Sequence, residues 1–236
     1  MEEIELTVVL PTFRECENLA IFIPQIEKEF SDVLLEIIVV DDNSQDGTDK
    51  LIETLNLRYQ NIRLIVRPSL FGIGSAIRRG YDDARGEYIL SSDADLSFSV
   101  ADMRVLLNTI QQGFGLVTGY RHNGGNYERK TLAVKVKYFV SRWGNKIVQK
   151  ISGLKTRDFS ANFRVIRRDA WKKIETQEKT NALLFEMIVK AYRQGIKITE
   201  VPVAFSERKF GNSKLNIWKE APKFLIKFIK YSFLDN

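Results

Sequence analysis

The sequence has very little cysteine and histidine. Its 236 residues include one of each, Cys16 and His122. A single cysteine excludes an intramolecular disulfide and a cysteine zinc cluster, which fits a reducing compartment. A single histidine excludes histidine-rich metal sites, and it stands in a glycine-rich stretch without the G-x-S-x-G turn of a serine hydrolase. Zinc chemistry and Ser-His-Asp catalysis are therefore not expected.

The sequence also lacks a long apolar run. No segment offers the roughly 18 uncharged apolar residues of a transmembrane helix, and the acidic beginning with its short apolar run does not fit a signal peptide. We therefore expect a cytoplasmic protein. The net charge of +6 favours an anionic partner, which could be nucleic acid, a membrane surface or a phosphorylated small molecule.

Short β-branched runs alternate with longer amphipathic runs up to about residue 119. This alternation predicts an α/β fold with a mainly parallel sheet flanked by helices. Ligands of such sheets bind beyond the carboxyl ends of the strands, and polar clusters follow three of the predicted strands here: "PTFRECEN", "DDNSQDGT" and "SSDADLS". The predicted strands are 6–10, 34–40, 62–66 and 87–91, and the predicted helices are 18–30, 47–57 and 74–84.

The second half of the chain is more varied. A stretch rich in glycine and asparagine leads into a basic, aromatic segment that predicts a helix over 131–152. Two more strands are predicted at 162–168 and 196–211, with a helix at 183–194 between them. We predict one catalytic domain over residues 1–216 and a C-terminal amphipathic helix over 217–236.

Asp93 and Asp95 stand one residue apart at the end of a predicted strand. Two carboxylates presented to one side repel each other unless a cation lies between them. Oxygen ligands select Mg²⁺, Mn²⁺ or Ca²⁺. An EF-hand calcium loop is excluded because Phe98 stands where glycine is required and Arg104 where glutamate is required. A solvated turn after the strand is the alternative for this motif taken alone.

Two other motifs are weaker. "DDNSQDGT" could cap a helix or hydrogen-bond a nucleoside, and capping is the role we favour from the motif alone. "FGIGSAIRRG" contains three glycines but has Ile77 where a dinucleotide-binding motif needs glycine, and it follows the third strand rather than the first. We therefore do not predict a dinucleotide site.

Several motifs in order along residues 6–216 resemble the family 2 glycosyltransferases, and most closely their dolichyl-phosphate and polyprenyl-phosphate mannosyltransferase group. "VVLPTFRECENL" resembles P-T-Y-N-E-x-E-N-L, "VVDDNSQDGT" resembles V-D-D-x-S-x-D-G-T, and "FGIGSAIRRGYDDARGEYILSSDADLS" resembles G-L-G-x-A followed by D-A-D-L-Q. "GIKITEVPVAFSERKFGNSKL" resembles the end of the catalytic domain. The resemblance implies the GT-A nucleotide-sugar fold.

The resemblance also implies roles for individual residues. Asp93 and Asp95 would be catalytic and would hold Mn²⁺ or Mg²⁺ together with Ser97, Asp93 also touching the nucleotide sugar. Arg121 would be catalytic and would bind the acceptor phosphate with Lys137 and Ser141, with Arg129 as a competing candidate. The remaining nucleotide-sugar residues would be Pro11, Phe13, Glu15, Val40, Asp42, Arg208 and Lys214.

Three positions depart from the family pattern. Arg14 replaces an asparagine, Ser97 replaces a glutamine that would help to hold the metal, and "DFSANFR" replaces D-x-T-S-G-F-R. The serine at position 97 affects the expected coordination of the metal. The departures at Arg14 and in "DFSANFR" affect the expected identity of the donor sugar and of the acceptor.

The expected reaction is a metal-dependent, inverting transfer of mannose from GDP-mannose to dolichyl or polyprenyl phosphate. A metal and cationic side chains neutralise the leaving diphosphate, and an ionised lipid phosphate needs no strong general base. Transfer from a UDP-sugar such as UDP-glucose, to the same lipid or to a saccharide, is the enzymatic alternative. A nucleic-acid-binding module is the alternative of another class, and the acidic clusters at the strand ends argue against nucleic acid as a partner.

The C-terminal segment raises a membrane question. Its apolar face and lysines suit a helix lying on anionic lipid, which predicts peripheral attachment at the cytoplasmic face of the membrane. A terminal helix packed on the domain is the alternative. The sequence leaves open whether a separate membrane-anchoring subunit takes part.

Overall fold

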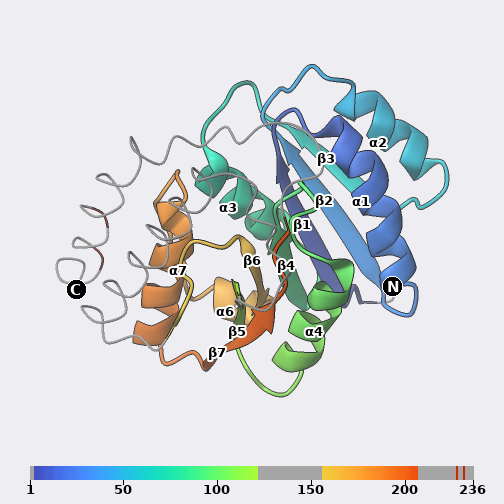
Figure 1. The fold of residues 1–236 in the computed structure, drawn as a ribbon. Helices are drawn as coiled ribbons and strands as arrows, with labels where there is room; N and C mark the ends of the chain where they lie inside the picture. The colour runs from blue at the N-terminus through green and yellow to red at the C-terminus, as the bar shows by residue number, and fades with distance from the viewer. Residues whose placement is uncertain (1–2, 122–155, 207–226, 228–230, 232–236) are drawn as a thin grey trace.

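A seven-stranded sheet forms the centre of the computed structural model of the protein, which describes residues 3–121, 156–206, 227 and 231 (Figure 1). The strand order is β3-β2-β1-β4-β6-β5-β7. Among these strands, β6 runs antiparallel to both its neighbours and the others point the same way. The predicted mainly parallel sheet is confirmed. The strands are β1 (Leu6–Thr12), β2 (Leu35–Asp41), β3 (Ile62–Val66), β4 (Tyr88–Ser92), β5 (Leu116–Arg121), β6 (Phe163–Arg167) and β7 (Ile198–Val203).

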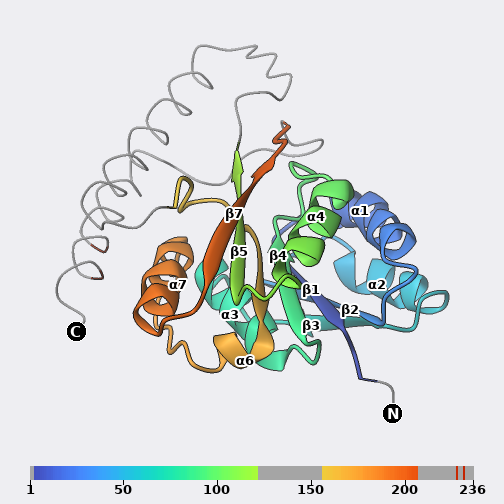
Figure 2. The same ribbon diagram turned by 90° about the horizontal axis from the view of Figure 1, so that it is seen from below.

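Helices cover both faces of the sheet (Figure 2). Leu19, Ile52 and Met103 from three helices pack in one apolar cluster, while Ile77 and Leu183 pack in a second cluster on the opposite face. The helices of the first face are α1 (Cys16–Glu29), α2 (Thr48–Asn56) and α4 (Val100–Ile110), and those of the second are α3 (Ile73–Asp83), α6 (Arg168–Trp171) and α7 (Ala182–Arg193).

The central strands are buried on both faces because their side chains alternate between the two clusters. In β2, Ile37 and Val39 belong to the first cluster, whereas Ile38 and Val40 belong to the second. All four are fully buried. A strand covered on both sides has no solvent face for polar residues, which accounts for the continuous apolar run "IIVV" over residues 37–40.

Two elements inside the first half, α4 and β5, were not among the predicted strands and helices. The helix α4 begins at an N-cap residue, Ser99, whose hydroxyl accepts a hydrogen bond from the Asp102 amide and donates one to the Asp102 carboxylate. Met103, Leu106 and Ile110 then follow at helical spacing, so the signal was present in the sequence. The strand predicted over 196–211 is shorter, Ile198–Val203, and the helix predicted over 131–152 lies outside the described residues.

Two residues of the C-terminal segment are described, and both contact the domain. The Lys227 ammonium pairs with the Glu178 carboxylate and donates to Thr180 Oγ1 at 3.1 Å, and the Tyr231 hydroxyl donates to Glu178 at 2.9 Å. Tyr231 is 2% exposed. These two side chains therefore pack on the domain. Within the described part of the chain, no helix combines the length and the apolar character needed to cross a membrane.

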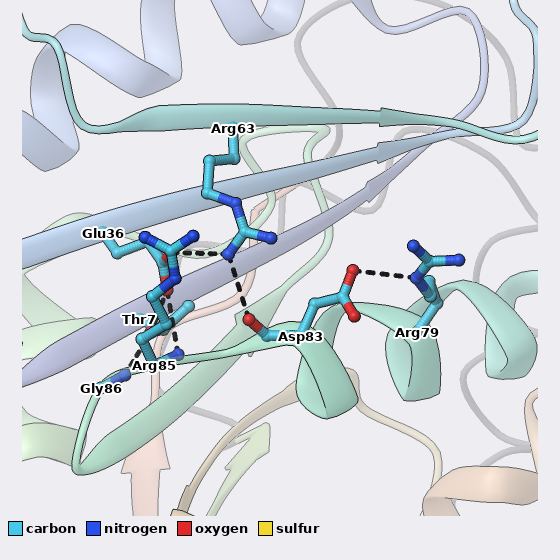
Figure 3. A network of polar contacts seen from close by, with 7 residues as sticks. All are labelled: Thr7, Glu36, Arg63, Arg79, Asp83, Arg85 and Gly86. Atoms are coloured by element: carbon cyan, nitrogen blue, oxygen red, sulfur yellow. Dashed lines mark hydrogen bonds and ion pairs between the residues drawn. The ribbon is translucent and has the colours of Figure 1, made fainter.

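A polar network lies where the central strands begin, at the edge of the sheet opposite the three polar clusters (Figure 3). The buried carboxylate of Glu36 accepts hydrogen bonds from Thr7 Oγ1 at 2.8 Å, from Arg63 Nη1 at 2.8 Å and from the Arg85 amide at 3.1 Å. The Thr7 oxygen in turn accepts from the Gly86 amide at 2.9 Å. One carboxylate thus ties together β1, β2, β3 and the turn before β4.

Replacing Glu36 should destabilise the fold. Glu36→Ala leaves the buried Thr7 hydroxyl and the partly buried Arg63 guanidinium without this partner, so we expect the free energy of unfolding to fall by about 2–3 kcal/mol. Urea denaturation measures this free energy of unfolding. The matched control is Glu53→Ala on the exposed side of α2, which should change it by no more than about 0.5 kcal/mol. Equal effects of the two substitutions would contradict the role given to the network.

Candidate functional site

The strand directions bring the predicted site residues to one edge of the sheet. The parallel strands β1, β2, β4 and β5 all end at this edge, and β6, being antiparallel, begins there. The register pairs Pro11 with Val40, and it pairs Ser92, just before Asp93, with Phe163. The residues just before β6 therefore lie beside the carboxyl ends of β4 and β5.

The turn after β4 holds Asp95 in a fixed position. Asp95 is 7% exposed, and its Oδ1 accepts hydrogen bonds from the Ser97 amide at 3.1 Å and the Ser97 hydroxyl at 2.5 Å. Leu96 between them adopts a φ of 61°, a left-handed conformation that is uncommon for a residue other than glycine. Ser97, a candidate metal ligand from the sequence, thus contacts the carboxylate of Asp95.

Asp93, two residues earlier, is half-buried. Its Oδ1 accepts a hydrogen bond from Nδ2 of Asn162 at 3.1 Å. Asn162 is 2% exposed and belongs to the stretch "DFSANFR" that departs from the family pattern. Asn162 is not among the residues predicted from the sequence, because its contact with Asp93 depends on the pairing of β4 with β6.

The nucleoside residues predicted from the sequence lie at the ends of β1 and β2. Pro11 and Val40 are buried, and Phe13 and Glu15 are half-buried in the loop that follows β1. That loop is tied to the one after β2, because the Arg14 amide donates to Ser44 Oγ at 2.8 Å. Glu15 accepts a hydrogen bond from the side chain of Asn18 at 2.6 Å.

Asp42 pairs with a cation that the sequence did not single out. Nε of Arg67 donates to Asp42 Oδ1 at 2.5 Å, and Arg67 Nη1 donates to Ser75 Oγ at 2.6 Å. Burial raises the pKa of the Asp42 carboxyl, and the neighbouring Arg67 only partly opposes this effect. Through these two contacts the guanidinium of Arg67 links the end of β2 to the first turn of α3. Arg67 is 7% exposed, so the ion pair is largely shielded from solvent.

The other carboxylates of "DDNSQDGT" hold the loop itself. Asp41 accepts a hydrogen bond from the Ser44 amide at 2.9 Å. Asp46 accepts from the Cys16 amide at 3.1 Å and from Thr48 Oγ1 at 2.7 Å. Burial would raise the pKa of Asp46, but these hydrogen bonds outweigh it and lower the pKa. The motif therefore combines loop bracing at Asp41 and Asp46 with the ion pair at Asp42.

Arg121 is the last residue of β5 and forms a bidentate ion pair with Asp158. Its Nε donates to Oδ2 at 2.6 Å and its Nη2 donates to Oδ1 at 3.1 Å, while Nη2 also donates to Ser160 Oγ at 2.7 Å. The guanidinium lies 5.4 Å from the centre of the Phe205 ring. Burial would raise the pKa of Asp158, but Arg121 and the Ser160 hydrogen bonds lower it below its usual range. The pair holds Arg121 in one orientation at the edge of the site.

A third arginine, in addition to Arg67 and Arg121, lies within the sheet. Arg164 in β6 is fully buried, and its guanidinium donates to the carbonyl oxygens of Leu184 at 2.8 Å and Ala161 at 2.7 Å. Burial lowers its pKa to about 10, so it remains a cation at neutral pH. Its charge interacts with Asp93 and Asp158. The final arginine of "DFSANFR" is therefore part of the electrostatics of the site.

The side-chain chemistry of Asp93 and Asp95 fits Mg²⁺ or Mn²⁺. Both supply carboxylate oxygens, and a magnesium site typically uses one or two carboxylates and completes its shell with water and substrate phosphate. In the described part of the chain no cluster of three or more histidine, cysteine, aspartate or glutamate residues could hold a metal by itself. Arg129, Lys137, Ser141, Arg208 and Lys214, as well as His122, lie outside the described residues.

The chain belongs to glycosyl transferase family 2, whose family model matches residues 7–175. It is therefore a glycosyltransferase. Its relatives include a polyprenol monophosphomannose synthase from Mycolicibacterium smegmatis, 30% identical over 89% of this chain and 80% of that protein. They also include a dolichol-phosphate mannosyltransferase from Pyrococcus furiosus, 30% identical over 89% of this chain and 59% of that protein. A third, a dolichol-phosphate mannosyltransferase from Mycosarcoma maydis, is 30% identical over 89% of this chain and 73% of that protein.

Solved structures show the same fold. The glucosyl-3-phosphoglycerate synthase of Mycobacterium tuberculosis, in complex with Mn²⁺, UDP and phosphoglyceric acid, superposes with a TM-score of 0.75 over 99% of this chain and 80% of its own, at 16% identity. The same enzyme with Mn²⁺ and UDP-glucose gives a TM-score of 0.71 at 16% identity, over 99% of this chain and 80% of its own. This likeness confirms the GT-A type of fold that the sequence predicted.

The ion pair at the site should contribute stability that depends on pH. Asp158→Asn removes the negative charge, and we expect the free energy of unfolding at pH 7 to fall by about 2–3 kcal/mol, less than for a fully buried pair because Arg121 is partly exposed. The folded-state pKa of Asp158 lies below the unfolded value of about 3.9, so this difference is fully present above about pH 4 and shrinks as the pH falls further. Urea denaturation of both proteins at pH 7, 5 and 3.5 measures it. A difference that grows on acidification would contradict the assignment.

Proposed function

We propose that this glycosyltransferase moves mannose from GDP-mannose onto dolichyl or polyprenyl phosphate at the surface of a membrane. The observation that carries the proposal is the 30% identity, over 89% of the chain, to proteins described as polyprenol and dolichol-phosphate mannose synthases. Two neighbouring carboxylates and a braced arginine at one edge of the sheet support it, because the reaction brings two anionic groups together.

In this proposal the donor binds beyond β1, β2 and β4. The loops after β1 and β2 would receive the nucleoside, and Asp93 and Asp95 would hold a divalent cation near the diphosphate. That cation would offset the negative charge that develops on the leaving GDP. Arg208 and Lys214 are proposed as the cations on the other side of the diphosphate, from the motif resemblance alone.

The acceptor phosphate binds at Arg121 in this proposal. Asp158 and Ser160 fix the guanidinium through Nε and Nη2, so little rotational freedom remains to be lost when a phosphate arrives. Lys137 and Ser141, or Arg129, are proposed to share this phosphate. Arg121 would therefore orient one phosphate oxygen toward the anomeric carbon of the sugar.

The chemistry needs no strong base in this arrangement. A phosphate-monoester oxygen is already ionised near neutral pH, so no proton has to be removed before it attacks the anomeric carbon. The new carbon–oxygen bond forms on the face opposite the breaking bond to the diphosphate, which inverts the configuration, and GDP leaves with the bonding electrons. The residues of the site then have to bind, align and neutralise charge.

A transfer assay tests the proposed donor and acceptor. The protein is incubated with Mn²⁺, dolichyl phosphate and either labelled GDP-mannose or labelled UDP-glucose, and the label extracted into the organic phase is counted. We expect transfer from GDP-mannose. Transfer from UDP-glucose alone would leave the class of enzyme intact and overturn the proposed sugar, and no transfer from either donor would overturn the proposed reaction.

The two carboxylates have a separate test. Asp95→Asn keeps the shape of the side chain but removes its charge, so we expect kcat/KM for mannose transfer to fall about 100-fold or more. The matched control is Asp49→Asn on the exposed side of α2, which should leave kcat/KM unchanged. Parent-like activity of Asp95→Asn would remove Asp95 from the proposed site.

A further inference from the structure

A chain of buried polar side chains runs from helix α3 to the carboxylate of Asp93. The hydroxyls of Tyr81 and Ser91 lie 2.7 Å apart, and Ser91 Oγ donates to Asn162 Oδ1 at 2.8 Å. Asn162 Nδ2 donates to Asp93 Oδ1 at 3.1 Å. Tyr81, Ser91 and Asn162 are each no more than 2% exposed. The four groups come from α3, from β4, from the residue before β6 and from the residue after β4, so only the folded sheet brings them together.

The direction of these hydrogen bonds follows from the chemistry of the groups. An ionised carboxylate only accepts hydrogen bonds, so Asn162 must turn its NH₂ toward Asp93 and its oxygen toward Ser91. Ser91 then uses its single proton on Asn162, which makes Tyr81 the donor to Ser91. Burial raises the pKa of Tyr81 to about 12, so its hydroxyl keeps the proton at neutral pH. Every donor therefore points toward the site.

We call this chain of hydrogen bonds from Tyr81 through Ser91 and Asn162 to Asp93 the relay. The backbone that carries it is held in place by the sheet. Ser91 pairs with Arg164 and Ser92 with Phe163 in the antiparallel ladder, and the same register brings Asn162 opposite Asp93. At its other end, the Tyr81 ring packs edge-on against Trp171 with ring centres 4.9 Å apart. The buried amide of Asn162 restricts the rotation of the Asp93 carboxylate about its side-chain bonds.

We propose that Asn162 is a positioning residue for this enzyme, and that its amide, held by Ser91 and Tyr81, fixes the Asp93 carboxylate in the orientation that binds the divalent cation of the donor complex. The inference rests on the proposed function, because that cation belongs to it. Residues that orient metal ligands typically change metal affinity 10- to 100-fold when they are replaced. Asn162 lies in "DFSANFR", so a departure from the family pattern acquires a role here.

Binding of Mn²⁺ tests the inference without measuring activity. Free Mn²⁺ is followed by electron paramagnetic resonance as it is titrated into the purified full chain with saturating GDP. We expect Asn162→Ala to raise the apparent Kd for Mn²⁺ about 10-fold or more. The matched control is Asn56→Ala, which also loses two hydrogen bonds, to the backbone of Ile62 at the far end of the sheet, and should leave the Kd unchanged.

A double-mutant cycle distinguishes positioning from a purely structural role. Ser91→Ala should raise the Kd for Mn²⁺ about two- to threefold in the parent protein and have no effect once Asn162 is alanine, because the relay acts only through that amide. Tyr81→Phe keeps the ring contact with Trp171 and should cause a shift in the same direction, so a folded variant is available even if Asn162→Ala does not fold. Urea denaturation of each variant records its stability separately.

The outcomes separate this inference from the proposed function. If the parent binds Mn²⁺ and Asn162→Ala binds it equally well, the positioning role is wrong while the proposed function stands. If Ser91→Ala changes the Kd for Mn²⁺ equally in the parent protein and in Asn162→Ala, then Ser91 does not act through Asn162 and the proposed relay is contradicted. If the parent binds no Mn²⁺ in the presence of GDP, the metal-dependent transfer from GDP-mannose itself fails, and the inference fails with it.

Discussion

The antiparallel insertion of β6 between β4 and β5 is the constraint on which the rest of the site depends. A fully parallel sheet would place the residues before β6 at the opposite edge, far from the ends of β4 and β5. Because β6 runs the other way, Asn162 meets Asp93 and Asp158 meets Arg121 at the carboxyl edge. One reversal of strand direction therefore supplies the partners of both an acidic and a basic residue of the site.

The two sides of the site are braced in different ways. The basic side relies on an ion pair, in which Asp158 aligns the Arg121 guanidinium and offsets part of its charge. On the acidic side, two of the contacts come from neutral donors, because the Ser97 hydroxyl donates to Asp95 and the Asn162 amide donates to Asp93. The buried Arg164 adds a positive charge from within the sheet.

Much of the fold was predictable, and the site was predictable in part. The predicted strands of the first half and their helices are confirmed because local β-branched runs and helical periodicity carry that information. The helix α4 was missed although its N-cap residue, Ser99, and the helical spacing that follows it were visible in the sequence. Arg67, Arg164 and Asn162 were not found because each acts through partners distant in sequence. The assigned roles of Asp93, Asp95 and Arg121 stay predictions, now with defined surroundings.

The sequence by itself determined the α/β class, the family, and the placement of Asp93 and Asp95 at the end of a strand, since these follow from patterns within short stretches of chain. Only the tertiary structure decided which side chains, distant in sequence, hold Asp93 and Arg121. Asn162 is 69 residues from Asp93, and Asp158 is 37 from Arg121. Contacts over such separations depend on strand order and direction, which arise from packing two helical layers on one sheet rather than from local sequence.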